Sequence, residues 1–436
     1  MSAARETQRA PGKFRQDVVW NFASLAVLGL SGFALTSLIS RHYDESALGV
    51  FNQVLATYTI FSMLAAGGLN HSALRAVAEH AGDRRAVTSV VVGALLPALA
   101  LSAATALVYF GARGAVAGLL DSPATAAGIR ASTPGLFFFG INKVLLGVVN
   151  GAQRMRAFAV YQALRYLLIL VGLIGFVVLD ERREHGAELG FVFTFAEALL
   201  FLPLAVEVFL QTTRPLDRAW RAWSARHLRY GVRSFASGIL LEVHAKVDMW
   251  MIGLFLADGD VGVYTYASLV AEGVYQLLVV LQNVYNPILA RMIAAGELEA
   301  LHAMIARGRR RTYLAMGGVA ALAIALFPTV VRVLAAEKAA AYLPAWPSFA
   351  LLMGGIFLAS GYVPFGQTLL MAGRPAWHTL YMSAAVVLDV ALNAWMIPAG
   401  GLGWGLEGAA ASTAVSMSAG VFLLRALVRR EVGLRL

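Results

Sequence analysis

The sequence predicts an all-α membrane protein of about twelve transmembrane helices, arranged as two six-helix lobes. Apolar runs of about 20 residues, the length that an α-helix needs to cross a bilayer, recur along all 436 residues. The composition agrees, because 59% of the residues are hydrophobic and only 14% are charged, whereas soluble proteins carry roughly 25% charged residues. A transmembrane barrel would instead show alternating segments of about 10 residues, and the sequence has none.

Hydrophobic periodicity and length set the limits of each expected span. Gly and Pro inside several spans are compatible with helices, since neighbouring helices can satisfy the freed backbone groups in a membrane. The twelve spans are expected at about 17–39, 47–69, 87–110, 123–149, 158–179, 188–210, 234–256, 262–289, 312–335, 345–370, 378–398 and 405–427.

The distribution of basic residues predicts that both termini are cytoplasmic. With the N-terminus inside, 25 of the 35 Lys and Arg residues fall in inside segments and six in outside segments. Cytoplasmic loops carry this excess in membrane proteins, which also explains the net charge of +10 without nucleic acid. The two longest inside loops, 211–233 and 290–311, mix aromatic or apolar residues with arginines. We expect both loops to lie on the membrane surface.

An internal repeat divides the chain into an N-terminal lobe (1–210), a basic cytoplasmic linker (211–233) and a C-terminal lobe (234–436). Six spans per half is an even number, so both halves enter from the same side and the repeat is parallel. Two such lobes can enclose a cleft and expose it alternately to each side of the membrane. A shift of 213 residues aligns Phe22-Ala23-Ser24 with Phe235-Ala236-Ser237, Leu48–Phe51 with Val261–Tyr264, and Asn70 with Asn283.

Charged residues within the expected spans are the main functional clue, because a charge near the bilayer centre costs at least ~2.5–3.5 kcal/mol. Lys143 and Arg165 lie about 10 Å in from the cytoplasmic side of adjacent spans at 1.5 Å per residue. Two cations at equal depth suit an anion such as a phosphate or diphosphate. Arg130 points about 140° away from Lys143 on the same helix, so these two are not expected to share one site.

The seventh span, around 234–256, carries four titratable residues in its middle. Glu242 and Lys246 form one i, i+4 pair, and His244 and Asp248 form another. Lys246 could therefore be neutralised by its own helix. For each basic residue in a span, an internal ion pair that holds the bundle together remains the alternative to substrate binding.

The sequence gives little support to an enzymatic function. The chain has no cysteine, which excludes thiolate metal sites and cysteine nucleophiles. It also has no GxxxxGK[ST] phosphate loop and no HExxH zinc motif. The loops are too short for a soluble catalytic domain, so we predict no enzyme activity, no cofactor and no metal.

Three segments resemble the polysaccharide transporter family of the multidrug/oligosaccharidyl-lipid/polysaccharide exporter superfamily. KFRQDVVWNFASLAVLGLSGFALTSLISRHYDESALGVFNQVLA is similar to the first helix pair of that family, and NGAQRMRAFAVYQ to its inside turn between spans four and five. KVDMWMIGLFLADGDVGVYTYA is similar to its seventh-span Asp followed by Gly-Xaa-Tyr, here Asp248, Gly262 and Tyr264. Peptidoglycan-precursor flippases of the same superfamily carry two further C-terminal spans, whereas only GLRL follows the last basic cluster here.

The resemblance implies a flippase that moves an undecaprenyl-diphosphate-linked O-antigen or exopolysaccharide unit across the bacterial inner (cytoplasmic) membrane by alternating access. Membrane lipids, a glycan polymerase and export machinery are the partners that it implies, with coupling to H⁺ or Na⁺. Substrate-binding candidates are Lys143, Arg165, Lys246 and Arg130. Coupling-ion candidates are Glu272, Asp389 and Asp248.

Two other functions remain open at this stage. A cation-coupled multidrug antiporter on the same scaffold would be expected to place acidic residues in the N-terminal lobe. Spans one to five instead hold three cations and almost no acid, which favours an anionic substrate. A membrane glycan polymerase or glycosyltransferase would be expected to have a larger outside loop.

Overall fold

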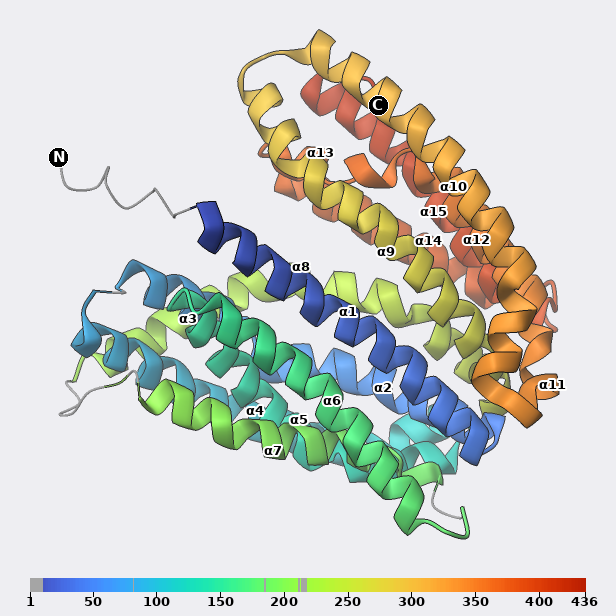
Figure 1. The fold of residues 1–436 in the computed structure, drawn as a ribbon, viewed down its shortest axis with the longest axis horizontal. Coiled ribbons are helices and arrows are strands. Elements are labelled where there is room, and N and C mark those ends of the chain that lie inside the picture. The colour runs from blue at the N-terminus through green and yellow to red at the C-terminus, as the bar shows by residue number, and fades with distance from the viewer. Residues whose placement is uncertain (1–10, 81, 184–185, 211, 213–217) are drawn as a thin grey trace. The chain divides into compact units, whose positions relative to one another are not determined.

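In the computed structural model, residues 11–80, 82–183, 186–210, 212 and 218–436 are described, without the side chains of 11–19, 21–25 and 232–245. Every regular element in these ranges is a helix, which confirms the predicted all-α fold (Figure 1). In chain order the first helices are α1 (Pro11–His42), α2 (Glu45–Ala66), α3 (Leu69–Glu79), α4 (Arg84–Leu119), α5 (Pro123–Gly151), α6 (Met155–Leu179), the 3₁₀ turn η1 (Gly186–Glu188) and α7 (Phe191–Phe209).

The second half of the chain is also helical. It comprises α8 (Trp220–Phe255), α9 (Asp258–Ala294), α10 (Leu298–Ala335), α11 (Ala339–Tyr342), α12 (Trp346–Ser360), α13 (Thr368–Met371), α14 (Pro375–Met396) and α15 (Gly405–Val432). Three 3₁₀ turns join them, namely η2 (Ala336–Lys338), η3 (Leu343–Ala345) and η4 (Val363–Phe365).

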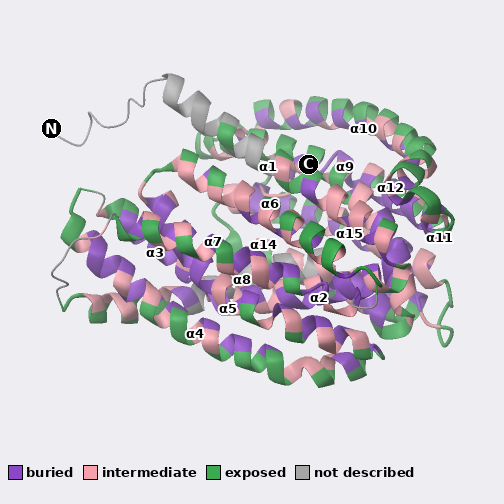
Figure 2. Cartoon of the chain, turned by 60° about the horizontal axis from the view of Figure 1, so that its bottom comes forward, coloured by how far each residue is buried: buried purple, intermediate pink, exposed green. Residues whose placement is uncertain are grey.

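Most of the long helices overlap a predicted membrane span. Among the described residues, nine segments are long and apolar enough to cross a membrane, and one of these, Leu298–Ser360, contains both α10 and α12. Large apolar side chains are exposed along them, for example Leu107, Val178 and Leu314 at 72%, 66% and 73%. Figure 2 shows buried and exposed residues alternating along these helices. Soluble proteins rarely expose apolar surface on this scale, whereas lipid-facing helices require it.

The tenth predicted span, 345–370, is not one continuous helix. Helix α12 ends at Ser360, and the chain then passes through η4 and the short α13. Pro364 lies in this break between Gly361 and Gly366. A Cβ at Gly361 would overlap the Tyr313 ring, so the chain approaches α10 more closely there than a larger residue would allow.

The two long inside loops are not separate surface segments, contrary to the prediction. Most of their described residues lie in the N-terminal parts of α8 and α10, which continue without a break into the apolar parts of these helices, and residues 290–294 are the end of α9. Leu301 and Ile305 on α10 are buried in a core with Leu289, Phe365 and Leu424. Their shared helical face therefore packs on protein, because neighbouring helices offer apolar side chains within reach.

The described residues of 1–38 and 54–239 form one compact unit, the first unit. Helices α4, α5 and α7 pack around buried side chains that include Val90, Val144 and Leu200. Glycine permits the closest approach, since a Cβ at Gly135 would meet the backbone of α7 at Phe193. Small residues at such crossings are the usual way in which membrane helices approach one another.

Within the first unit, the start of α8 packs on α3 and α4 through His227, which is fully buried. Its Nε2 lies 3.2 Å from the Val90 carbonyl oxygen and its Nδ1 lies 2.7 Å from Ser72 Oγ. Since a carbonyl can only accept, Nε2 carries the proton, and Ser72 donates to Nδ1. Trp223 stacks on the His227 ring at 5.6 Å between centroids. One neutral tautomer of histidine therefore satisfies both contacts.

Residues 39–53 and 240–436 form the second unit. The start of α2 crosses the start of α9 there, and Gln53 Nε2 donates to Asp258 Oδ1 at 2.9 Å. A Cβ at Gly49 would overlap the Asp258 carbonyl, and one at Gly262 would overlap the Glu45 carbonyl. Gly49 and Gly262 are the positions that the predicted repeat aligns, so corresponding glycines of the two halves meet at this crossing.

The buried His227 predicts a dependence of stability on pH. Burial lowers the pKa of His227 from its ordinary value of 6.5, and nearby Arg226 adds to this effect, whereas the bond to Val90 opposes it. A lowered folded-state pKa means that the unfolded chain takes up the proton first, so stability is lost as pH falls below 6.5. Thermal unfolding in detergent should show a midpoint that falls between pH 7.5 and pH 5.5.

The variant H227Q keeps an amide donor and removes the titration. At pH 7.5 its free energy of unfolding should be lower by about 1 kcal/mol, the value of one lost hydrogen bond, so its unfolding midpoint should also be lower. On acidification its midpoint should fall less steeply than that of the wild type. If the midpoints of the two proteins fell equally steeply as the pH is lowered, His227 would not be the group that makes stability depend on pH.

Candidate functional site

A buried ion pair forms the centre of the polar site in the first unit. Arg165 on α6 places Nε 2.7 Å from Glu197 Oε1 on α7, and the two side chains are 7% and 3% exposed. Taking one unpaired charge out of water costs several kcal/mol, so a buried charge requires a partner. Helices α6 and α7 pack side by side here (Figure 1).

Asn142 on α5 completes this arrangement. Its Nδ2 donates to Glu197 Oε2 and to the Glu197 carbonyl oxygen, both at 2.8 Å. Arg165 Nη2 also donates to Oε2 at 3.3 Å. The carboxylate therefore receives hydrogen bonds from two other helices, which fix its position.

The structure brings Lys143 and Arg165 together, as their equal depth suggested. Lys143 follows Asn142 on α5, and its Nζ lies 5.4 Å from the centre of the Phe139 ring. The Arg165 guanidinium carbon lies 4.8 Å from the centre of the same ring. Two cations from the adjacent helices α5 and α6 therefore lie against one aromatic ring, beside the Glu197 carboxylate.

The other two basic candidates lie apart from this site. Arg130 is 60% exposed and forms an ion pair of 2.5 Å with Glu188, about 20 Å along α5 from Lys143 at 1.5 Å per residue. Lys246 is half-buried on α8 in the second unit. The Glu242 and His244 side chains lie outside the described residues, so the two predicted i, i+4 pairs remain predictions.

A second polar cluster in the second unit joins Asp248 of α8 to Asp389 of α14. Asn393 lies one turn after Asp389, and its Nδ2 is 3.4 Å from Asp248 Oδ1 and 3.4 Å from Asp389 Oδ1. Asp389 is 1% exposed and Asn393 is fully buried. One amide group therefore bridges two carboxylates that come from different helices.

Hydroxyl groups supply the remaining contacts of the two carboxylates. Thr413 Oγ1 and Tyr264 OH donate to Asp248 Oδ2 at 2.7 and 3.1 Å. Ser412 Oγ and Ser416 Oγ donate to Asp389 Oδ1 at 2.9 and 3.1 Å. Four helices, α8, α9, α14 and α15, thus position one carboxylate pair.

The chemistry of this cluster suits a small cation or a shared proton. Asn393 Oδ1 is buried and accepts no hydrogen bond from the residues that the structure describes. Two carboxylates close together in an apolar surrounding also favour uptake of positive charge. Glu272, the third coupling candidate, is exposed on α9, and its side chain forms none of the contacts described for the cluster.

The uncharged polar residues of both sites were not predicted from the sequence. Glu197, an acidic residue in an apolar run, is not among the site residues predicted from the sequence. Asn393 follows Asp389 at i+4 on one helical face, a spacing that could have identified it. The hydroxyl residues of α15 gave no comparable sign, because Ser and Thr are common in membrane helices.

Proteins of known structure share the fold of this chain. Two solved structures share its fold at 13% identity: an inward-facing multidrug resistance MATE family transporter of the MOP superfamily and the lipid II flippase MurJ in an inward closed conformation. The TM-scores are 0.78 and 0.75, and the alignments cover 93% and 95% of this chain and 94% and 87% of the others.

A third match is a MOP superfamily transporter from Pyrococcus furiosus, with a TM-score of 0.58 and 12% identity over 95% of this chain and 94% of that one. No curated protein matches the sequence. A family model described as polysaccharide biosynthesis protein matches residues 15–293, which confirms the resemblance found in the sequence. The chain therefore belongs to the polysaccharide biosynthesis protein family and has the fold of the MOP superfamily transporters.

Proposed function

We propose that the protein is a flippase that moves an undecaprenyl-diphosphate-linked oligosaccharide across the bacterial cytoplasmic membrane by alternating access. Membership of the polysaccharide biosynthesis family and the fold shared with a lipid II flippase support this function. The substrate would be the repeat unit of an O-antigen or exopolysaccharide, handed on to a glycan polymerase and export machinery.

The basic side chains of the first-unit site support an anionic substrate. Lys143 and Arg165 lie against one aromatic ring, and the carboxylate of Glu197 is already engaged by Arg165 and Asn142. Two cations from adjacent helices beside one aromatic ring favour an anionic group such as a diphosphate over a cationic drug. A multidrug antiporter, the main alternative on this fold, would need an available carboxylate at this place.

The Asp248–Asp389 cluster is the proposed coupling site of this flippase. A sodium ion or a proton bound there neutralises carboxylate charge that is costly in the bilayer interior. Asn393 Oδ1 and the carboxylate oxygens offer the hard oxygen ligands that a sodium ion prefers. If a sodium ion binds, the hydroxyl groups of Thr413 and Ser412 would turn their protons away from the carboxylates. If a proton binds, they would keep their hydrogen bonds to the carboxylates.

Neutralising the buried ion pair separates its structural role from its transport role. R165Q alone leaves Glu197 buried without its cation, which should destabilise the protein by about 3–5 kcal/mol. The double variant R165Q/E197Q removes both charges, so it should unfold closer to the wild-type temperature. The measurement is thermal unfolding in detergent, and equal destabilisation in both variants would contradict the pairing.

Transport is then scored in a deletion strain, by the leaflet in which the lipid-linked repeat unit accumulates. K143Q and R165Q/E197Q should each reduce translocation by about tenfold or more, the value of one lost charge-assisted contact. Protein levels are matched by immunoblot. Normal glycan export in the deletion strain rejects the flippase, and undiminished transport by both variants rejects the cation site.

The two kinds of carboxylate candidate can be told apart by substitution. D389N should abolish the dependence of transport on a sodium or pH gradient, because it removes one charge from the bridged pair. E272Q is the matched comparison, since Glu272 is exposed and lies outside the hydrogen-bonded cluster. Loss of gradient dependence in E272Q with a normal response in D389N would move the coupling site to α9.

A further inference from the structure

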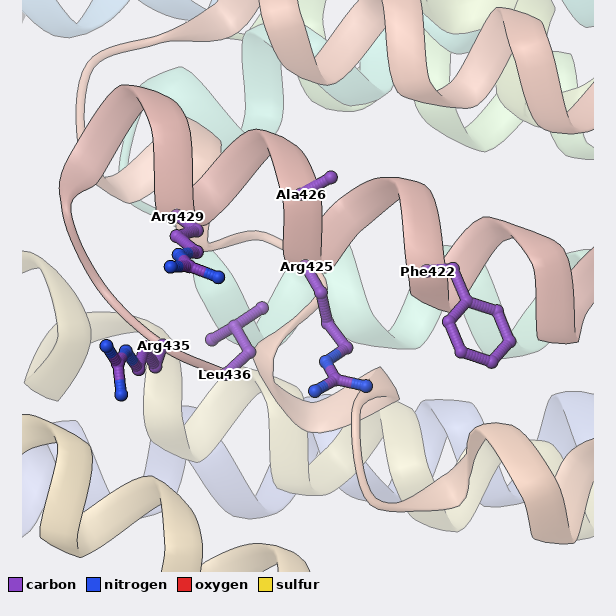
Figure 3. A pocket seen from close by; sticks show the side chains of 6 residues that line it. All are labelled: Phe422, Arg425, Ala426, Arg429, Arg435 and Leu436. Carbon is purple, nitrogen blue, oxygen red and sulfur yellow. The ribbon is translucent and has the colours of Figure 1, made fainter.

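A cavity of about 370 Å³ lies at the end of α15, in the second unit. Its size is in the usual range of small-ligand pockets. Figure 3 shows the side chains that line it, some from α15 and some from the segment that turns back after the helix. The lining residues are Phe422, Arg425, Ala426, Arg429, Arg435 and Leu436.

The end of α15 builds this pocket. Gly433 adopts a left-handed conformation with φ of 72°, which ends the helix and reverses the chain. Leu434 and Leu436 are buried in the core at 1% and 5% exposure. Arg435, between them, is exposed on the side of the pocket, and its carbonyl accepts a bond of 2.8 Å from His302 Nδ1 on α10.

Three arginines therefore lie around one cavity. The one carboxylate among the groups that line it is the α-carboxylate of Leu436, the last residue of the sequence, so positive charge is in excess there. Arg425 and Arg429 are an i, i+4 pair of like charge, which costs a few tenths of a kcal/mol in a helix. Glu431 lies nearby on α15, but it pairs with Arg430 at 3.5 Å. An anion in the pocket would relieve the repulsion, and arginine is well suited to hold a phosphate with two hydrogen bonds.

The pocket also has an apolar end. Phe422 is 67% exposed and lies one turn before Ala426, toward the apolar middle of α15. The arginines lie toward the end of the helix that the basic-residue distribution places in the cytoplasm. Positive charge at the headgroup level with an apolar surface below it matches a phosphate ester attached to acyl chains.

We propose that this pocket is a binding site for the phosphate headgroup of an anionic phospholipid. Arg425, Arg429 and Arg435 hold the phosphate, and Phe422 contacts the upper part of an acyl chain. The site lies outside the Asp248–Asp389 cluster and outside the Arg165–Glu197 site, so it binds a membrane lipid independently of the proposed transport.

Native mass spectrometry of the purified full-length protein tests this site by titrating lipids of identical acyl chains. Wild type should bind phosphatidylglycerol more tightly than phosphatidylcholine. R429Q/R435Q should weaken phosphatidylglycerol binding by about 30-fold, which corresponds to about 1 kcal/mol for each cation near an anionic lipid. F422A should also weaken binding of the lipid.

The control R84Q/R85Q removes the same charge from two exposed arginines at the start of α4, in the first unit. It should bind phosphatidylglycerol as the wild type does. Equal losses in the control and in R429Q/R435Q, or equal affinity for the two lipids, would overturn the site. sn-Glycerol 3-phosphate should compete only weakly with phosphatidylglycerol for the pocket. If it displaced the lipid at equal concentration, the pocket would be a site for a soluble phosphate compound and not for a phospholipid.

Discussion

The cost of placing charge inside a low-dielectric bundle governs both polar sites of this protein. Arg165 and Glu197 meet this constraint by pairing directly, with Asn142 donating one hydrogen bond to the second carboxylate oxygen. Asp248 and Asp389 have the same sign and cannot do so. Their charge is distributed over one amide and four hydroxyl groups instead, which leaves a place for positive charge from outside the chain.

This difference gives the two units complementary chemistry. The first unit places two basic side chains beside an aromatic ring, which suits recognition of an anionic headgroup. The second unit carries a carboxylate pair, which suits a coupling cation. Each site is assembled from three or four helices, so a change in the packing of one unit alters the affinity of its site. Transporters that work by alternating access need such a link between binding and helix packing.

Much of the fold could be predicted from the sequence, because apolar runs longer than a bilayer is thick admit few other structures. Asp248, Asp389 and Arg165 could be predicted as site residues because charges stand out in such runs. The break at Pro364 could not, since Pro97 and Pro134 lie inside unbroken helices. Asn142 and Asn393 were missed because neutral polar residues acquire a role only through the helix faces that pack together.

The most direct test of the account uses purified protein in vesicles and compares two substrates. An undecaprenyl-diphosphate-linked oligosaccharide in one leaflet is followed by its accessibility to a membrane-impermeant glycosidase, and a fluorescent cationic drug is followed in parallel. The account predicts that the glycolipid crosses the bilayer well above the rate in protein-free vesicles and that the drug does not move. Drug transport together with glycolipid movement at the protein-free rate would contradict it.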